Sequence, residues 1–167
     1  MVQTRQLAAI MFADIMSYTA IMQQDEARAM QLKDKLKTTL EKELQLHGGR
    51  LIKFSGDGAL CSFGSALEAV KAAISAQLVM QQAPTVPLRI GIHQADVLFD
   101  ESDVFGDGVN IASRLESMAV PGSIFVSGKV VDDIKNHTEI QTTSLGKYVL
   151  KNVAQPVEIF AISNAGL

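Results

Sequence analysis

The sequence predicts a fold in which helices pack on a β-sheet, of the α/β or α+β class. Three observations support this class. The apolar run Leu7–Ala13 has the composition of a strand buried on both faces. Amphipathic segments with apolar residues at helical spacing follow it, and short alternating runs bounded by turn residues lie between them. Because the 167 residues contain no low-complexity stretch or evident linker, we expect one domain over residues 1–167.

The first half of the sequence continues from this strand with a helix and a hairpin. A long helix is expected over about residues 25–48, where His47-Gly48-Gly49 ends it. Four leucines at successive turns form its apolar face: Leu32, Leu36, Leu40 and Leu44. The turn Gly56-Asp57-Gly58 then joins the runs Arg50–Ser55 and Ala59–Phe63, and Asp-Gly between two such runs predicts a β-hairpin.

The second half repeats the alternation of helices and strands. Ser65-Ala-Leu-Glu68 is a capping box that predicts the start of a second helix, which ends before Pro84. Its expected apolar residues are Leu67, Val70, Ile74 and Leu78. Pro87–Leu98 is the next predicted strand, and Gly106-Asp-Gly108 opens a further helix. A strand over Ser123–Ser127, a short helix and a terminal pair of strands complete the expected order.

Composition excludes several classes of protein. Apolar residues make up 47% and charged residues 20%, as in ordinary soluble domains. The net charge of −3 argues against a nucleic-acid or anionic-membrane surface. No apolar run approaches the length of a membrane span, so we expect a cytoplasmic location for this segment. The single cysteine, Cys61, is expected to be a small buried side chain.

Three places in the sequence carry candidate functional residues. Asn110 and Arg114 lie one turn apart on one face of a predicted helix, where they could orient a sugar and meet phosphate charge. Asp14 follows the first strand, at an edge where open sheets often bind ligands, and Asp57 lies in the hairpin turn. Each has a structural alternative. Asn110 and Arg114 could belong to a polar helix face, Asp14 could cap a helix, and Asp57 could be a plain turn residue.

Four segments together resemble motifs of the class III nucleotidyl cyclases, the adenylate and guanylate cyclase homology domain. They lie in the order that the family shows, and the resemblance covers about residues 5–162. The segments are Phe12–Thr19, Lys53–Gly58, Asp103–Arg114 and Leu150–Val157. The resemblance implies an α+β sandwich with a ferredoxin-like βαββαβ core, additional C-terminal strands, and helices packed on an antiparallel-rich sheet.

The resemblance also implies a reaction and its metal ligands. The family forms a 3′,5′-cyclic nucleotide by attack of the ribose 3′-oxygen on the α-phosphate, releasing pyrophosphate. By this likeness Asp14, Asp57 and the backbone carbonyl of Ile15 bind two divalent ions, Mg²⁺ or Mn²⁺, which prefer such hard oxygen ligands. Because the implied ligands are carboxylates, no histidine cluster is needed. The three histidines, His47, His93 and His137, are dispersed and have no metal-binding spacing.

Five further residues match the substrate-binding positions of the family. Arg114 would stabilise charge at the α-phosphate, Asn110 would hold the ribose, and Lys151 would contact the β- and γ-phosphates. Lys53 and Asp103 would select the base. A donor-only lysine and an acceptor-only carboxylate complement N1 and N6 of adenine, whereas guanine reverses this pattern. The expected activity is therefore adenylate cyclase, with ATP as substrate.

Two alternatives remain open from the sequence. One is a guanylate or mixed-specificity cyclase, and the other is a catalytically silent nucleotide-binding or dimerisation domain. Ser17 stands where the family most often has glycine. Serine is tolerated at this position if its φ is negative. Phe105 replaces a Trp or Tyr often found there, a milder change because it keeps an aromatic group.

The family completes its active sites between two protomers. The metal aspartates come from one chain, and the base, ribose and phosphate groups come from the other. The sequence contains both sets, so we expect a homodimer with two shared sites and no need for a different partner. The motifs leave no room for a sensor. We therefore expect either a free-standing catalyst or a catalytic module of a longer native chain that carries the regulatory domain.

Overall fold

The structure is a computed structural model that describes residues 3–167. These residues form eight strands and five helices. In order they are β1 (Thr4–Ile15), α1 (Tyr18–Gln24), α2 (Glu26–Leu46), β2 (Arg50–Ser55), β3 (Gly58–Phe63), α3 (Ala66–Met80), β4 (Leu88–Phe99), β5 (Val104–Phe105), α4 (Asp107–Met118), β6 (Ile124–Ser127), α5 (Gly128–Ile134), β7 (Thr142–Tyr148) and β8 (Val157–Ile162). Within this described range, no helix is long and apolar enough to cross a bilayer.

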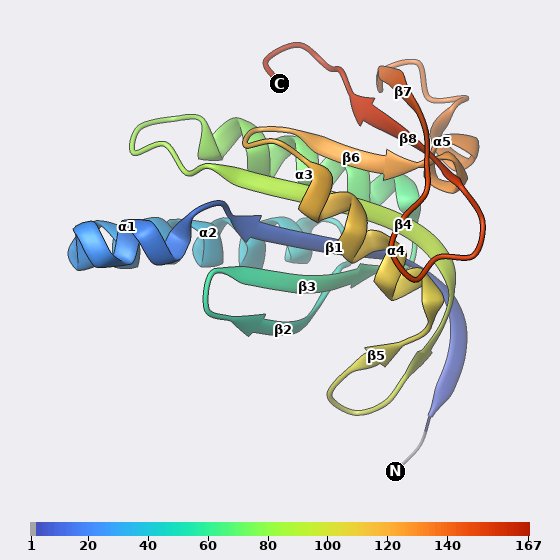
Figure 1. The fold of residues 1–167 in the computed structure, drawn as a ribbon, viewed down its shortest axis with the longest axis horizontal. Helices are drawn as coiled ribbons and strands as arrows, with labels where there is room; N and C mark the ends of the chain where they lie inside the picture. The colour runs from blue at the N-terminus through green and yellow to red at the C-terminus, as the bar shows by residue number, and fades with distance from the viewer. Residues whose placement is uncertain (1–2) are drawn as a thin grey trace.

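All eight strands belong to one sheet, shown in Figure 1. Seven of them follow the order β2-β3-β1-β4-β6-β8-β7, and β5 pairs with β4. Neighbouring strands are antiparallel except for β4 and β6, which are parallel. The first four strands, with their helices, form the ferredoxin-like βαββαβ core that the family resemblance implied, and β6, β8 and β7 extend it. The α+β fold class is confirmed.

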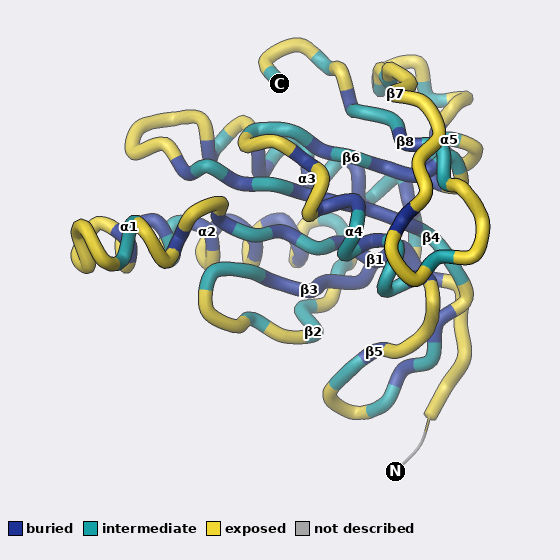
Figure 2. Tube along the Cα trace, in the orientation of Figure 1, coloured by how far each residue is buried: buried dark blue, intermediate teal, exposed yellow. Residues whose placement is uncertain are grey.

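The sheet is buried on both faces in its centre (Figure 2). In β1, alternate residues such as Met11 and Ile15 pack in the core shared with α2 and α3. Ile10 lies in a second apolar cluster on the other face, together with Ala112 of α4. By the same alternation Asp14 belongs to the face that α4 covers. The strand thus presents a carboxylate to the helix that carries the predicted phosphate-binding arginine.

The predicted two-faced burial of the first strand is right for Ala8–Ala13 and wrong for Leu7. Leu7 is 59% exposed. The reason lies in the pairing of β1: Thr4–Ala8 pairs with β4 alone, whereas β3 joins on the other side only from Ala9 onward. This N-terminal part of the strand therefore lies at an uncovered edge of the sheet.

The long predicted helix is confirmed, and all four of its predicted leucines are buried in the core. It begins at Glu26 because the side chain of Asp25 accepts a hydrogen bond from the Arg28 amide at 3.0 Å. The extended backbone of Asp25 separates it from α1, a short helix that the expected order of elements did not include. The single cysteine is also as predicted: Cys61 is buried in β3, and burial raises its pKa to about 12.

The predicted apolar face of α3 is wrong in part. The Glu68 amide donates to Ser65 Oγ at 3.3 Å, as the capping box requires, but the Glu68 side chain binds His47 at 3.0 Å instead. Leu78 is 40% exposed. The buried face consists largely of small residues: Ala66, Ala69, Val70, Ala72, Ala73 and Ala76. Alanines let the helix approach the sheet closely, so the larger side chains lie at its flanks.

Ser17 adopts a left-handed conformation, with φ 61° and ψ 28°. The condition for tolerating serine here, a negative φ, is therefore not met. We expect Ser17→Gly to raise the free energy of unfolding by about 1 kcal/mol, because glycine adopts this conformation without a Cβ clash. Urea unfolding would measure it. Ser17→Ala is the control, since it keeps the Cβ and should give no gain; an equal gain from both would contradict the strain argument.

Candidate active site

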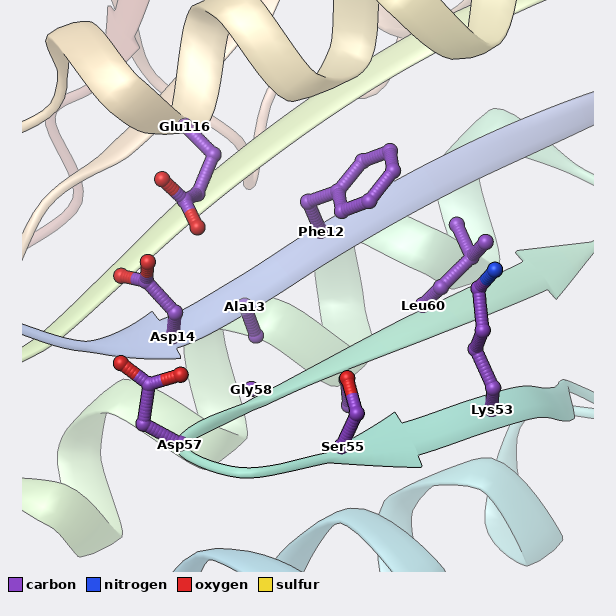
Figure 3. A pocket seen from close by; sticks show the side chains of 10 residues that line it. Phe12, Ala13, Asp14, Lys53, Ser55, Asp57, Gly58, Leu60 and Glu116 are labelled. Atoms are coloured by element: carbon purple, nitrogen blue, oxygen red, sulfur yellow. The ribbon is translucent and has the colours of Figure 1, made fainter.

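Asp14 and Asp57 line one cavity of about 180 Å³ (Figure 3). Asp14 is the penultimate residue of β1, and Asp57 lies in the turn between β2 and β3. The Ile15 amide donates to the Asp57 carbonyl at 2.9 Å and so ties the turn to the end of β1. A Cβ at Gly58 would lie 2.9 Å from the Ala13 carbonyl oxygen, so only glycine permits this close approach. The structure thus places the two predicted metal ligands together.

Two charged residues that were not predicted from the sequence lie beside Asp14, and one of them, Glu116, also lines the cavity. Arg89 lies opposite Asp14 in the β1–β4 pairing, and its Nε and Nη2 donate to the two Asp14 oxygens at 3.0 and 2.9 Å. Glu116 of α4 is 3.5 Å from the same Nη2. The hydrogen bonds that Arg89 donates to Asp14 raise the pKa of Arg89. Burial, followed by the neighbouring Asp14, raises the pKa of Glu116.

The donor chemistry of this cavity fits a hard divalent cation. Carboxylate oxygens are the ligands that Mg²⁺ and Mn²⁺ prefer, and Asp14 already holds a cationic group, the Arg89 guanidinium. In the part of the chain that the structure describes, no three acidic, His or Cys side chains are grouped to hold one ion. A metal bound here would therefore take its remaining ligands from backbone, water or substrate oxygens.

Lys53 and Asp103, the predicted base-selecting pair, contact each other directly. Lys53 Nζ donates to Asp103 Oδ2 at 3.1 Å. The other oxygen of Asp103 accepts from the Val104 amide at 2.8 Å. The Val104 amide and then Lys53 lower the pKa of Asp103, which keeps it an acceptor. Figure 3 shows the Lys53 amine at the opposite end of the cavity from the carboxylates of Asp14 and Asp57.

The predicted ribose- and phosphate-binding residues lie on α4 and in the loop before β8. Asn110 Nδ2 donates to the Lys151 carbonyl oxygen at 3.4 Å, which links these two residues. Lys151 itself is exposed, in an exposed stretch that follows β7 (Figure 2). Arg114 is half-buried, and its buried Nε has no hydrogen-bond partner within residues 3–167. Among residues 3–167, Arg114 forms no salt bridge.

One chain does not bring all eight predicted residues together. Asp14, Asp57 and Lys53 line the cavity, whereas Asn110, Arg114 and Lys151 are absent from its described lining. The cavity volume of about 180 Å³ is also below the range of roughly 300–1,000 Å³ usual for small-molecule sites. The described lining of this cavity thus contains only three of the eight predicted residues.

Arg89 and Glu116 had signals in the sequence. The buried side of α4 consists of Gly108, Ala112, Leu115 and Glu116. Glu116 therefore follows Gly108 and Ala112 at the spacing of successive helical turns. A carboxylate on a buried helix face needs a partner. Arg89 is a charged residue near the start of a strand that is otherwise apolar there. Which partner each one finds depends on strand pairing, which the local pattern does not give.

The comparison with known families decides the assignment. The family model of the adenylate and guanylate cyclase catalytic domain matches residues 1–164. The chain belongs to this family. The four motifs and the ferredoxin-like core therefore have a common origin with those of other cyclase catalytic domains.

Similar proteins carry adenylate cyclase names. The Rhizobium meliloti (strain 1021) protein "Putative adenylate cyclase 3" is 36% identical over 167 residues, which is 95% of this chain and 28% of that protein. An adenylate cyclase of Streptomyces coelicolor is 32% identical over 128 residues, 75% of this chain and 34% of that protein. The chain thus spans about a third of the length of these curated relatives.

Solved structures share the fold over almost the whole chain. The adenylate/guanylate cyclase/hydrolase of Silicibacter pomeroyi has a TM-score of 0.88 at 31% identity, covering 96% of this chain and 98% of that one. The adenylyl cyclase CyaB of P. aeruginosa has a TM-score of 0.87 at 23% identity, covering 99% of this chain and 97% of that one. The second likeness supports the fold alone.

His93 has a structural role behind α4 and provides a test by pH. It is 6% exposed, contacts Ser127 Oγ at 2.6 Å, and has its pKa lowered to about 4 by burial and by Lys129. An unfolded histidine has a pKa of about 6.5, so the unfolded chain binds an extra proton between these values and stability falls as pH falls. Between pH 7 and 5 we expect wild type to lose about 2 kcal/mol relative to His93→Gln.

Urea unfolding at several pH values measures this difference. His137→Gln, at a histidine whose side chain is 42% exposed, is the matched control and should keep the wild-type pH dependence. Equal pH dependence in wild type and His93→Gln would contradict a neutral buried imidazole.

Proposed function

We propose that this domain is an adenylate cyclase that converts ATP to 3′,5′-cyclic AMP and pyrophosphate in a homodimer. The observation that carries the choice of ATP is the Lys53–Asp103 contact of 3.1 Å. It places a donor-only and an acceptor-only group side by side, which complements N1 and N6 of adenine. Guanine would leave both groups mispaired, and mispaired polar groups in a binding site are costly.

Asp14 and Asp57, with the Ile15 carbonyl, are the groups that would hold two divalent ions. Such ions lower the pKa of the 3′-hydroxyl and neutralise triphosphate charge when bound. The fit rests on the shared cavity and on the Arg89 cation that Asp14 already binds. Because both carboxylates act on the same ions, we expect loss of either one to be as harmful as loss of both.

The remaining residues would bind and orient the nucleotide. Bond formation between the 3′-oxygen and the α-phosphorus accompanies loss of the hydroxyl proton and departure of pyrophosphate. Arg114 would stabilise the charge that develops at the α-phosphate, since its fixed guanidinium has an unpaired Nε. Asn110 would hold the ribose in line for attack. Lys151, exposed on its loop, would contact the β- and γ-phosphates as a mobile charge.

A shared-site dimer accounts for the separation of these groups in one chain. The aspartates line a cavity that is too small for a usual ligand, and the ribose- and phosphate-binding residues lie outside it. In a two-fold dimer, the aspartates of one protomer would face Lys53, Asp103, Asn110, Arg114 and Lys151 of the other. This arrangement predicts that specific activity falls when the protein is diluted below its dimer dissociation constant.

The test is product formation from ATP and from GTP, with Mg²⁺ or Mn²⁺, across a protein dilution series. We expect cyclic AMP from ATP, at least about tenfold less cyclic GMP from GTP, and a specific activity that rises with protein concentration. Equal use of GTP would contradict the role of Lys53 and Asp103. Nucleotide binding without pyrophosphate release, in a demonstrably dimeric sample with Mn²⁺, would indicate a silent domain.

A further inference from the structure

Glu116 lies beside Asp14, and the proposed function gives it no role. Its side chain is 9% exposed, and a buried carboxylate is costly unless it is paired. Its cationic neighbour is Arg89, whose Nη2 lies 3.5 Å from Glu116 Oε2 and 2.9 Å from Asp14 Oδ2. One guanidinium therefore stands between two carboxylates and is bound more closely by Asp14.

Arg89 and a metal ion compete for Asp14. The guanidinium engages both Asp14 oxygens, at 3.0 and 2.9 Å. A divalent cation on the same carboxylate would lie close to this positive charge in a partly buried setting, where repulsion is strong. Asp14 can become a metal ligand at low cost only if Arg89 has another acceptor to move to.

The packing of α4 on β4 holds that acceptor in place. A Cβ at Gly91 would lie 2.3 Å from the Glu116 amide nitrogen, so the helix rests directly on the strand. Arg89 Nη1 also donates to the Ser117 carbonyl oxygen at 3.3 Å, near the C-terminal end of α4. A guanidinium that releases Asp14 thus remains attached to α4, with Glu116 beside it.

We propose that Glu116 is a positioning residue that takes Arg89 from Asp14 when a divalent ion binds, and so frees the aspartate for the metal. This inference rests on the proposed function, because it assumes that Asp14 binds metal. The competing role, Glu116 as a third metal ligand, is disfavoured because residues 3–167 contain no group of three such side chains able to hold an ion.

The experiment is a double-mutant cycle in which Mn²⁺ affinity is measured by electron paramagnetic resonance. The proteins are wild type, Glu116→Gln, Arg89→Met and the double variant. Glu116→Gln keeps the side-chain shape and cannot become the carboxylate that would pair with Arg89. We expect it to weaken Mn²⁺ binding at least about fivefold when Arg89 is present and less than about twofold in the Arg89→Met background. An equal loss in both backgrounds, or no loss in either, overturns the proposal.

Asp14→Asn identifies a failure of the proposed function itself. If wild type binds Mn²⁺ no better than Asp14→Asn, then both the metal site and the role of Glu116 are wrong. If Asp14→Asn weakens binding and Glu116→Gln does not, only the role of Glu116 is wrong.

A second measurement needs no Glu116 variant to fold. The side-chain Nε–H signal of Arg89 in ¹H–¹⁵N NMR, assigned by its loss in Arg89→Met, should move as Mg²⁺ is added and in step with the backbone signal of Asp14. A stationary Arg89 signal while the Asp14 signal shifts to saturation overturns the proposal.

Discussion

Replacing Arg114 with alanine is expected to lower kcat by about 100- to 1,000-fold, because it removes a fixed donor from the charge that develops in the transition state. The buried Nε of Arg114 lacks a hydrogen-bond partner in the described chain. An unpaired buried donor is costly, and a bound substrate oxygen would satisfy it. The KM for ATP should change less than about threefold, since the interaction forms mainly in the transition state.

Steady-state kinetics with saturating metal would separate these two effects. Arg114→Lys keeps the positive charge without the planar fork and should fall between wild type and alanine. Arg28→Ala, which removes an exposed arginine from α2, is the matched control and should retain full activity. A large rise in KM with kcat preserved would instead assign Arg114 to ordinary substrate binding.

How well the sequence predicted each helix depended on the size of its apolar residues. In α2, large apolar side chains at successive turns form one face that packs in the core, as predicted. These are Leu32, Leu36, Leu40 and Leu44. In α3, the alanines form the contact with the sheet and Leu78 is left exposed. A pattern of large residues misjudges a helix whose close packing depends on small ones.

The candidate site could also be predicted only in part from local sequence pattern. Asp14 and Asp57 could be selected from local pattern, since one ends an apolar strand and the other lies in a hairpin turn. Arg89 and Glu116 could not be assigned, because their significance comes from the register that sets Arg89 opposite Asp14 and from the packing of α4 on Gly91. Contacts between distant segments are set by the tertiary fold, which local periodicity does not encode.

Mixing Asp57→Ala with Arg114→Ala is expected to restore activity that neither variant has alone. If sites are shared, each mixed dimer has one site with both lesions and one site with neither. Random pairing makes half of the dimers mixed, and each of these has one working site of two, so the mixture should reach about a quarter of wild-type activity. Native mass spectrometry would establish the fraction of mixed dimers, against which the recovered activity is measured.

The control is a pair of lesions within the same half of the site. Asp14→Asn mixed with Asp57→Ala should show no recovery, because every composite site then lacks one of the two aspartates. Recovery in the first mixture and none in the second requires that the aspartates and Arg114 of one working site come from different chains. If neither mixture recovers activity although mixed dimers are present, each protomer must use its own residues. Arg114, which does not line the aspartate cavity, would then have to approach it by a movement within one chain.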